Sequence, residues 1–325
     1  MINRFYEDAD SSAPSTDDGQ RWLDEWTESV QRRLLDWYQV HRRDLPWRDA
    51  LDPYRVVVAE VMLQQTGVER VRPKFEEFVR QFPSFTALAD APTADVIRAW
   101  SGLGYNRRAV NLQRLARVVV DQHDGALPAS VGELRRLPGI GPYTAGAIAS
   151  FVHGHDAAAI DVNVRRVVGR LAFGTTDLPV RTIDRLAEQL VPAGKSRDWN
   201  QALMDFGSSQ CTLTRPACLI CPLRDACSYT RISQVDRTRA PSSTLRRVAE
   251  TREPFVGSSR FYRGRVVECL RQLPAGDWLA ITDLGPRVKD DWNPSDQEWL
   301  AGIVAGLARD GLVVIDDSSV SLPGG

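Results

Sequence analysis

One carboxylate stands inside an apolar run near residue 60. Residues 56–63 read Val-Val-Val-Ala-Glu-Val-Met-Leu, and Glu60 is the single polar residue among them. On a helix that starts after Pro53, apolar side chains share its face. Because desolvation disfavours the charged form, this pattern predicts a raised pKa for Glu60, the condition for a general acid near neutral pH. A salt bridge to an arginine, or a place on a polar edge of the helix, is the structural alternative.

A second acid ends another apolar run. Asp161 follows Ala-Ala-Ala-Ile at 157–160 and precedes Asn163, Arg165 and Arg166. Either Asp161 or Asn163 could simply cap a helix that begins there. Beside arginines a carboxylate would also stay ionised at neutral pH. One protonated and one ionised carboxyl group is the pattern of enzymes that hydrolyse glycosidic bonds.

Four cysteines lie close together in the sequence. They follow the spacing C-x6-C-x2-C-x5-C, namely Cys211, Cys218, Cys221 and Cys227, with Cys269 separate. The chain has no secretory signal, so disulfides are disfavoured and metal coordination is favoured. Zinc and an iron–sulfur cluster both accept four thiolates, and the wider loops favour the cluster modestly. For Cys269 we expect a buried, small apolar side chain.

A glycine-rich turn follows residue 137. The segment 133–148 predicts a helix, a tight turn at Gly139 and Gly141, and a second helix opened by Pro142. The backbone N–H groups of such a turn and the positive end of the second helix form an anion site, for which a DNA phosphate is the natural ligand. A helical corner whose glycines serve packing is the alternative.

Periodicity predicts an all-α fold from about Trp22 to Tyr229. Apolar residues recur at helical spacing in 22–40, 69–82, 105–120, 163–172 and 197–210. Residues 1–20 are predicted to be a disordered acidic tail and 231–258 a basic linker. In 259–325, a capping box at Ser295, a helix stop at Gly311 and a hairpin over 312–322 predict a winged-helix-like module. A three-helix bundle with a frayed tail is the alternative.

Charge is segregated along the 325 residues. The net charge is −1, yet residues 231–265 carry nine arginines against three acids, and 266–325 carry four basic residues against ten acids. A basic middle between acidic ends is compatible with a polyanionic partner. No run of about eighteen apolar residues and no signal peptide is present, so we expect a soluble, cytoplasmic protein without a membrane partner.

From Trp22 to Tyr229 these motifs jointly resemble the helix-hairpin-helix DNA glycosylases, and among them most closely the MutY-like adenine glycosylases. The resemblance rests on segments 45–48, 60–66, 102–105, 137–146, 161–163 and 200–205 together with the four-cysteine loop. It implies a six-helix domain over about 50–155 and a helical iron–sulfur domain over 21–49 and 156–230. It also implies a [4Fe-4S] cluster on the four cysteines, mismatched double-stranded DNA as partner, and a monomer.

The resemblance also implies a role for each matching residue. Glu60 matches the general acid that protonates an extruded adenine, and Asp161 the carboxylate that stabilises the sugar cation. Tyr143 and Asn163 match residues that orient these carboxylates. The family's base pocket matches Trp47, Arg48 and Asp205. Its wedge in the duplex matches Leu63, Gln65 and Tyr105, and its positions beside the opposing base match Thr66 and Leu103. Gly139 and Gly141 match the phosphate-binding hairpin. For Trp47 and Tyr105, plain core packing is the alternative.

Lysine is scarce, with only Lys74, Lys195 and Lys289 in the chain. Relatives with lyase activity, such as endonuclease III, place in the hairpin a lysine that attacks the sugar as a Schiff base. Tyr143 stands there in this sequence. We therefore expect a monofunctional glycosylase that leaves the abasic site uncut.

Two departures keep alternatives open. Residues 260–325 do not resemble the NUDIX-like domain with which MutY proteins commonly read 8-oxoguanine, and Asn106 stands where many of them have a second tyrosine. The primary interpretation is removal of adenine opposite 8-oxoguanine or guanine. The alternatives are a glycosylase for T:G or U:G mismatches and a non-enzymatic iron–sulfur protein that binds DNA.

Overall fold

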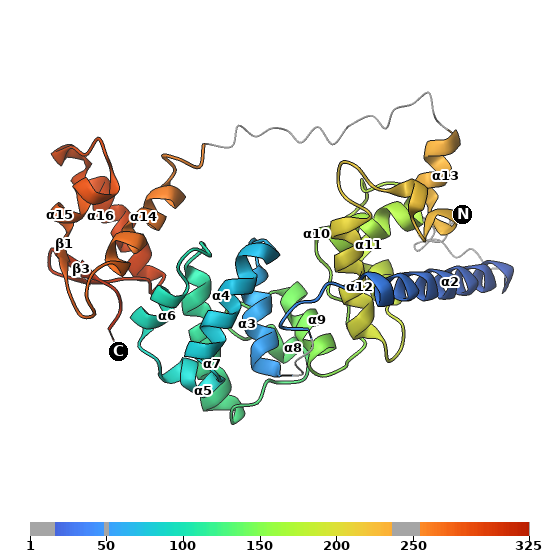
Figure 1. Ribbon diagram of the computed structural model, residues 1–325, viewed down its shortest axis with the longest axis horizontal. Helices are drawn as coiled ribbons and strands as arrows, with labels where there is room; N and C mark the ends of the chain where they lie inside the picture. The colour runs from blue at the N-terminus through green and yellow to red at the C-terminus, as the bar shows by residue number, and fades with distance from the viewer. Residues whose placement is uncertain (1–16, 49–51, 236–253, 325) are drawn as a thin grey trace. The chain divides into compact units, whose positions relative to one another are not determined.

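The computed structural model describes residues 17–48, 52–235 and 254–324, and it is mainly helical (Figure 1). Its described residues divide into two compact units. The cysteine unit comprises residues 17–45, 129–135 and 140–235, and the Glu60 unit comprises 46–48, 52–128, 136–139 and 254–324. The predicted all-α fold with a small winged-helix-like module is confirmed. None of the described helices combines the length and apolar composition that a membrane span requires.

Five helices form the first part of the Glu60 unit: α3 (Pro53–Leu63), α4 (Val68–Gln81), α5 (Phe85–Asp90), α6 (Thr93–Ala99) and α7 (Arg107–His123). Helix α3 begins where the Asp52 side chain accepts a hydrogen bond from the Tyr54 N–H, with Pro53 in the first helical position. Aromatic side chains fill the core between these helices. The rings of Phe78 and Trp100, for example, meet edge to face at 5.7 Å.

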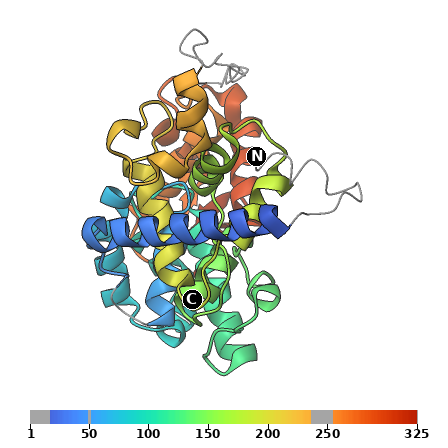
Figure 2. The same cartoon turned by 90° about the vertical axis from the view of Figure 1, so that its right-hand side faces the viewer.

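The cysteine unit contains a long N-terminal helix, α2 (Asp17–His41), which Figure 2 shows lying across α12 (Ser196–Ser209). Its other helical segments are α8 (Val131–Leu134), α9 (Pro142–Phe151), α10 (Val162–Val168), the π-turn η1 (Gly169–Phe173), α11 (Val180–Gln189), the 3₁₀ turns η2 (Cys218–Ile220) and η3 (Arg224–Ala226), and α13 (Ser228–Val235). One apolar core joins α2, α10 and α12 through side chains such as Leu34, Val167 and Trp199.

Two predicted boundaries differ from the structure. Helix α2 already begins at Asp17, within the predicted tail. Helix α13 runs to Val235 and so includes the first residues of the predicted linker. Residues 1–16 of the predicted tail and 236–253 of the predicted linker lie outside the described residues, and the remaining domain boundaries stay predictions.

The C-terminal module has the element order of a winged helix: α14 (Ser259–Arg271), β1 (Leu279–Ala280), α15 (Ile281–Val288), the 3₁₀ turn η4 (Pro294–Asp296), α16 (Gln297–Arg309), β2 (Val314–Asp316) and β3 (Ser319–Ser321). The strands pair antiparallel in the order β1-β3-β2, and Val320 of β3 pairs with Leu279 on one side and Ile315 on the other. Val320 is fully buried in the module's core.

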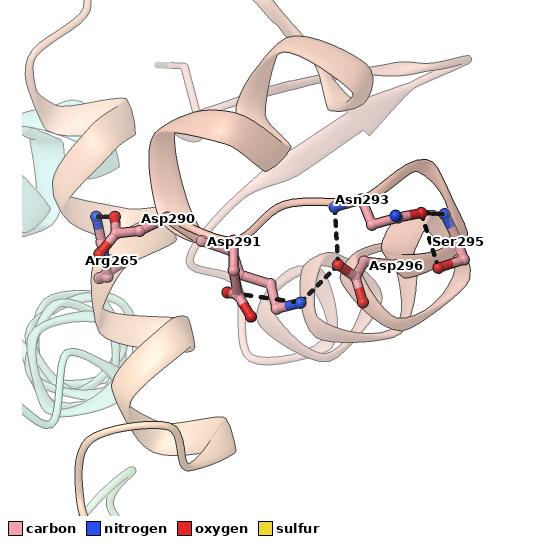
Figure 3. A network of polar contacts seen from close by, with 7 residues as sticks. Arg265, Asp290, Asp291, Asn293, Ser295 and Asp296 are labelled. Carbon is pink, nitrogen blue, oxygen red and sulfur yellow. Dashed lines mark hydrogen bonds and ion pairs between the residues drawn. The ribbon is translucent and has the colours of Figure 1, made fainter.

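The capping box of this module lies two residues earlier than predicted. Asn293, rather than Ser295, caps the helical segment, and Asp296 completes the box by accepting from the Asn293 N–H (Figure 3). Lys289 forms an ion pair with the same Asp296 carboxylate at 2.6 Å. The start is shifted because Pro294 is best placed in the first helical turn, where its missing N–H costs nothing.

Candidate functional site

Glu60 lies in the middle of α3 and is only 5% exposed. Its neighbours along the helix, from Val56 to Met62, are all buried as well. The apolar run around this carboxyl group is therefore buried together with it. Its assignment as the general acid stays a prediction.

The predicted wedge residues follow two helix ends in the same unit. Leu63 is the last residue of α3, and Gln65 and Tyr105 both have left-handed backbones, with φ of +58° and +46°. Tyr105 is 51% exposed. Left-handed backbones cost non-glycine residues of order 1 kcal/mol each, so the surrounding structure must impose them.

Arg108 is the residue that joins these two segments. Its guanidinium donates to the carbonyl oxygens of Val61, Met62 and Gln64 at one helix end, and to those of Leu103 and Gly104 in the other loop. It also donates to the Thr66 hydroxyl at 2.9 Å. Burial lowers the pKa of Arg108 to about 10, still high enough to keep it charged at neutral pH.

Sequence analysis missed Arg108. The available signal was its place on the apolar face of α7, four and seven residues before Leu112 and Leu115, which are fully buried. An arginine at a core position needs several acceptors, because an unpaired buried charge is strongly destabilising.

Other predicted residues of the Glu60 unit are buried. Trp47 packs edge to face on Phe75 at 5.2 Å, as expected if Trp47 serves core packing. Arg48, the next residue in the chain, is also buried. The Leu103 side chain is also buried, and its carbonyl oxygen accepts from the Thr66 hydroxyl. Roles of these residues at a base stay predictions.

The glycine-rich turn connects α8 to α9. Gly139 has φ of +79°, and a Cβ there would press on the Asn111 side chain at 3.1 Å, so only glycine fits without strain. Gly141 is different: its φ is −89° and its surroundings are open. The torsional freedom predicted for Gly141 is therefore not needed, and its place is that of the N-cap of α9, with Pro142 next.

In the cysteine unit, Asp161 is the N-cap of α10. Its Oδ1 accepts from the backbone N–H groups of Asn163 and Val164, at 2.8 and 2.7 Å, and its Oδ2 accepts from the Asn163 side-chain amide at 2.8 Å. Nearby, Arg165 holds Asp184 through two hydrogen bonds. Capping, the structural alternative for Asp161, is thus observed, and the same three donors and helix end also stabilise a negative charge.

Asn163 continues this hydrogen-bond chain to the cysteine loop. Its Oδ1 accepts from Arg166 at 2.9 Å, and the same guanidinium donates to the Gly207 and Cys211 carbonyl oxygens. The orientation of Asp161 is therefore connected, through Asn163 and Arg166, to the loop that begins at Cys211. Burial lowers the pKa of Arg166 from its ordinary value.

Two further predicted residues have partners within the cysteine unit. The Tyr143 hydroxyl lies 3.4 Å from the Met204 sulfur. Asp205 is 1% exposed, and its carboxylate accepts from the Arg43 side chain at 2.6 Å and from the Arg43 N–H at 3.2 Å. This ion pair joins α12 to the segment after α2 and gives Asp205 a structural purpose that sequence analysis did not foresee.

The four predicted cysteine ligands line one cavity, with Leu171, Phe206 and Tyr229 among the other lining residues. All are free thiols. Within the described residues no three metal-ligating side chains converge closely enough for a single ion. Burial raises the pKa values of Cys218 and Cys227, and that of Cys221 to about 12. Buried thiols of this kind lose their protons only to a strongly cationic centre.

Arg170 holds the start of this loop. The π-turn η1 contains Arg170, which donates to the Thr212 and Leu213 carbonyl oxygens and lies 3.5 Å from the Cys211 sulfur. Its guanidinium stacks over the Tyr229 ring at 5.1 Å. The cavity thus offers four sulfur donors and a neighbouring positive charge, which fits an anionic iron–sulfur cluster.

Comparison with known proteins places these features in a family. Residues 58–193 match the HhH-GPD superfamily of base excision DNA repair proteins. A thermostable thymine-DNA glycosylase of known structure superposes with a TM-score of 0.61 and 31% identity, covering 65% of this chain and 99% of that one. An endonuclease III–DNA complex, at 22% identity and a TM-score of 0.55, shares the fold. The chain belongs to the HhH-GPD superfamily.

Similar proteins of known activity show to which family within this superfamily the chain belongs. The adenine DNA glycosylase of Mycolicibacterium smegmatis is 39% identical over 241 residues, which are 73% of this chain and 79% of the relative. The adenine DNA glycosylase of Homo sapiens is 41% identical over 207 residues, 60% of this chain and 38% of that protein. The chain belongs to the adenine DNA glycosylase family, as the resemblance predicted.

Proposed function

We propose that this protein is a monofunctional DNA glycosylase that removes adenine mispaired with 8-oxoguanine or guanine. The observation that carries the proposal is a carboxyl group buried in the middle of an apolar helix, Glu60, in a chain of the adenine DNA glycosylase family. A base inside a duplex is out of reach, so the adenine is flipped out of the stack before reaction.

The proposed reaction uses the two carboxyl groups in opposite protonation states. Protonated Glu60 donates its proton to N7 of adenine, the C1′–N9 bond breaks, and its electron pair leaves with the neutral base. The Asp161 carboxylate, held by three N–H donors, stabilises the resulting sugar cation by its charge or by a brief covalent bond. Water then adds to C1′ and loses a proton, which leaves an abasic site.

No strand cleavage should accompany base release. Tyr143 stands in the hairpin where a lyase carries its lysine, and the nearest lysine in the sequence, Lys195, is more than fifty residues away. Without an amine to form a Schiff base, β-elimination has no catalyst.

We further propose that Cys211, Cys218, Cys221 and Cys227 hold a [4Fe-4S] cluster. The cavity that the four thiols share, with Arg170 beside Cys211, supports this assignment. Iron would supply the positive charge that deprotonates these buried thiols and would tie the loop together. Analysis of iron and acid-labile sulfide in the purified protein tests it: both should be present, and both should be lost in Cys221→Ser.

A duplex-cleavage assay tests the function. Duplexes with A:8-oxoG, A:G, T:G and U:G pairs are incubated with the protein, and half of each sample is treated with hot alkali. We expect strand breaks only after alkali and only at the adenine, with Glu60→Gln slowing base release by about 10²-fold or more.

The matched control is Glu69→Gln, on the exposed first turn of α4, which should keep full activity. Undiminished activity in Glu60→Gln would remove the proposed acid. Release of thymine or uracil opposite guanine would favour the T:G or U:G alternative, toward which the thymine-DNA glycosylase relative points.

A further inference from the structure

A groove of about 570 Å³ runs through the Glu60 unit beside the predicted wedge. One wall contains Gln65, Arg70, Tyr105 and Arg107, and the other contains Arg260 and Arg263 of α14. The winged-helix module therefore contributes one side of a groove whose other side carries the two exposed residues with left-handed backbones.

The two walls belong to one packed body. Arg271 of α14 donates to the Ile97 carbonyl oxygen at 3.0 Å and to the Asn106 side chain at 2.9 Å. Ile97 of α6 and Val110 of α7 are buried in the same apolar core as the module's own side chains. Hydrogen bonds and a shared apolar core thus connect the elements that form the two walls.

Asn106 takes part in the contact between the module and the rest of the unit. Its side-chain oxygen accepts from Arg271, whose pKa is lowered by burial and whose side chain is only 8% exposed. An asparagine at this position is thus explained by docking of the module.

The groove is strongly basic. Asp310 shares its carboxylate between Arg263 and Arg107, so these three side chains carry a net positive charge. Among the described residues, no carboxylate pairs with Arg70 or Arg260, and both are exposed. The rest of the module differs, since residues 266–325 carry four basic residues against ten acids.

This distribution decides which face of the module can meet a polyanion. The exposed side of α16, the last helix of the module, offers Gln297, Glu298 and Ala301 and no cation before Arg309. Arginine guanidinium groups bind phosphate oxygens with charge-assisted hydrogen bonds. Among the described residues of the module, the α14 side that faces the groove presents two arginines, Arg260 and Arg263.

We propose that the groove binds the phosphate backbone of duplex DNA next to the mismatch, with Arg70 and Arg260 as phosphate contacts from its two walls. The winged-helix module is thereby part of the DNA-binding surface. This inference rests on the proposed function for the identity of the duplex, while the binding itself is independent of base release.

The experiment measures binding of the full chain to a fluorescent A:8-oxoG duplex at several salt concentrations. Arg260→Ala should weaken binding about fivefold and reduce the slope of log affinity against log salt by about one, and Arg70→Ala should do the same. The matched control is Arg287→Ala on α15, an exposed arginine of the same module outside the groove, which should change neither quantity. Binding to a fully paired duplex should weaken equally, because a phosphate contact carries no sequence information.

Unchanged affinity and salt slope in both Arg260→Ala and Arg70→Ala would overturn the proposal. Since both side chains are exposed, thermal unfolding of the variants should match that of the parent chain. If no duplex loses a base but Arg260→Ala still weakens binding, the proposed glycosylase function is wrong and the proposal that the groove binds DNA is supported. If base release occurs and the arginine variants bind like the parent, the groove fails and the function stands.

Discussion

Asp161 has a structural role that the structure shows and a chemical role that we propose. As the N-cap of α10 it accepts two backbone N–H bonds, and as a carboxylate it carries the negative charge that the proposed reaction requires. Asparagine can accept the two backbone hydrogen bonds through its single oxygen without the charge, since Asn and Asp are about equally good N-caps, but it loses the bond from the Asn163 side-chain amide. The two purposes can therefore be separated by substitution.

Asp161→Asn keeps the backbone cap and should destabilise the protein less than Asp161→Ala, which should lose about 1 kcal/mol with the cap. Both should slow adenine release by about 10²-fold or more, because neither stabilises the sugar cation. Denaturant unfolding and single-turnover base release measure the two effects. An Asp161→Asn variant with parental activity would show that the cap alone matters.

Helix α9 packs unusually close to the segment before Asp161. A Cβ on Gly146 would collide with the Ala158 carbonyl oxygen. Asn200 of α12 fixes that segment from the other side, accepting from the Ala159 N–H and donating to the Ala157 carbonyl oxygen. The position of the chain leading into α10 therefore depends on the missing side chain of Gly146 and on the amide of Asn200, which also donates to the Ser150 hydroxyl.

Gly146→Ala should destabilise the protein by about 1–3 kcal/mol, because the backbone segment must move to admit the methyl group. The comparison is Gly132→Ala in the short helix α8, where a Cβ meets nothing within 4 Å and the change should be neutral or slightly stabilising. Chemical unfolding of the two variants checks the difference. Equal free energies of unfolding for the two variants would mean that the backbone of residues 157–159 can move to admit the methyl group without loss of stability.

In the molecule as a whole, the winged-helix module is built into the Glu60 unit. Ala94, Ile97 and Val110 share its core, and the Ala94 N–H donates to the Pro323 carbonyl oxygen near the end of the chain. The groove beside the wedge exists because of this packing, and so does the hydrogen bond of Asn106.

A chain that ends at residue 235 should accordingly be less stable and aggregate on concentration. Exposing Ile97 and Val110 costs of order 2 kcal/mol for each side chain. Thermal unfolding and size-exclusion chromatography against the full chain check this. A truncated chain that stays monomeric with the parental melting temperature would show that the module is only tethered.

Much of this protein could be read from local patterns. Helical periodicity located the long helices, and a single acid in an apolar run located Glu60. The close spacing of four cysteines located residues that line one cavity. Each of these signals lies within about twenty consecutive residues. Periodicity, capping and turn chemistry act over that range, and so they are visible without the fold.

Partners far apart in the chain were not visible. Arg108 and the helix end of 61–66, Asp205 and Arg43, and Asn106 and Arg271 are separated by more than 40, 160 and 160 residues. The local sequence around an arginine or an asparagine in a helix does not show whether its side chain faces solvent or a buried carbonyl oxygen. Which partner it meets is settled when burial of apolar surface packs distant helices together, because that driving force is non-directional and leaves no local spacing behind.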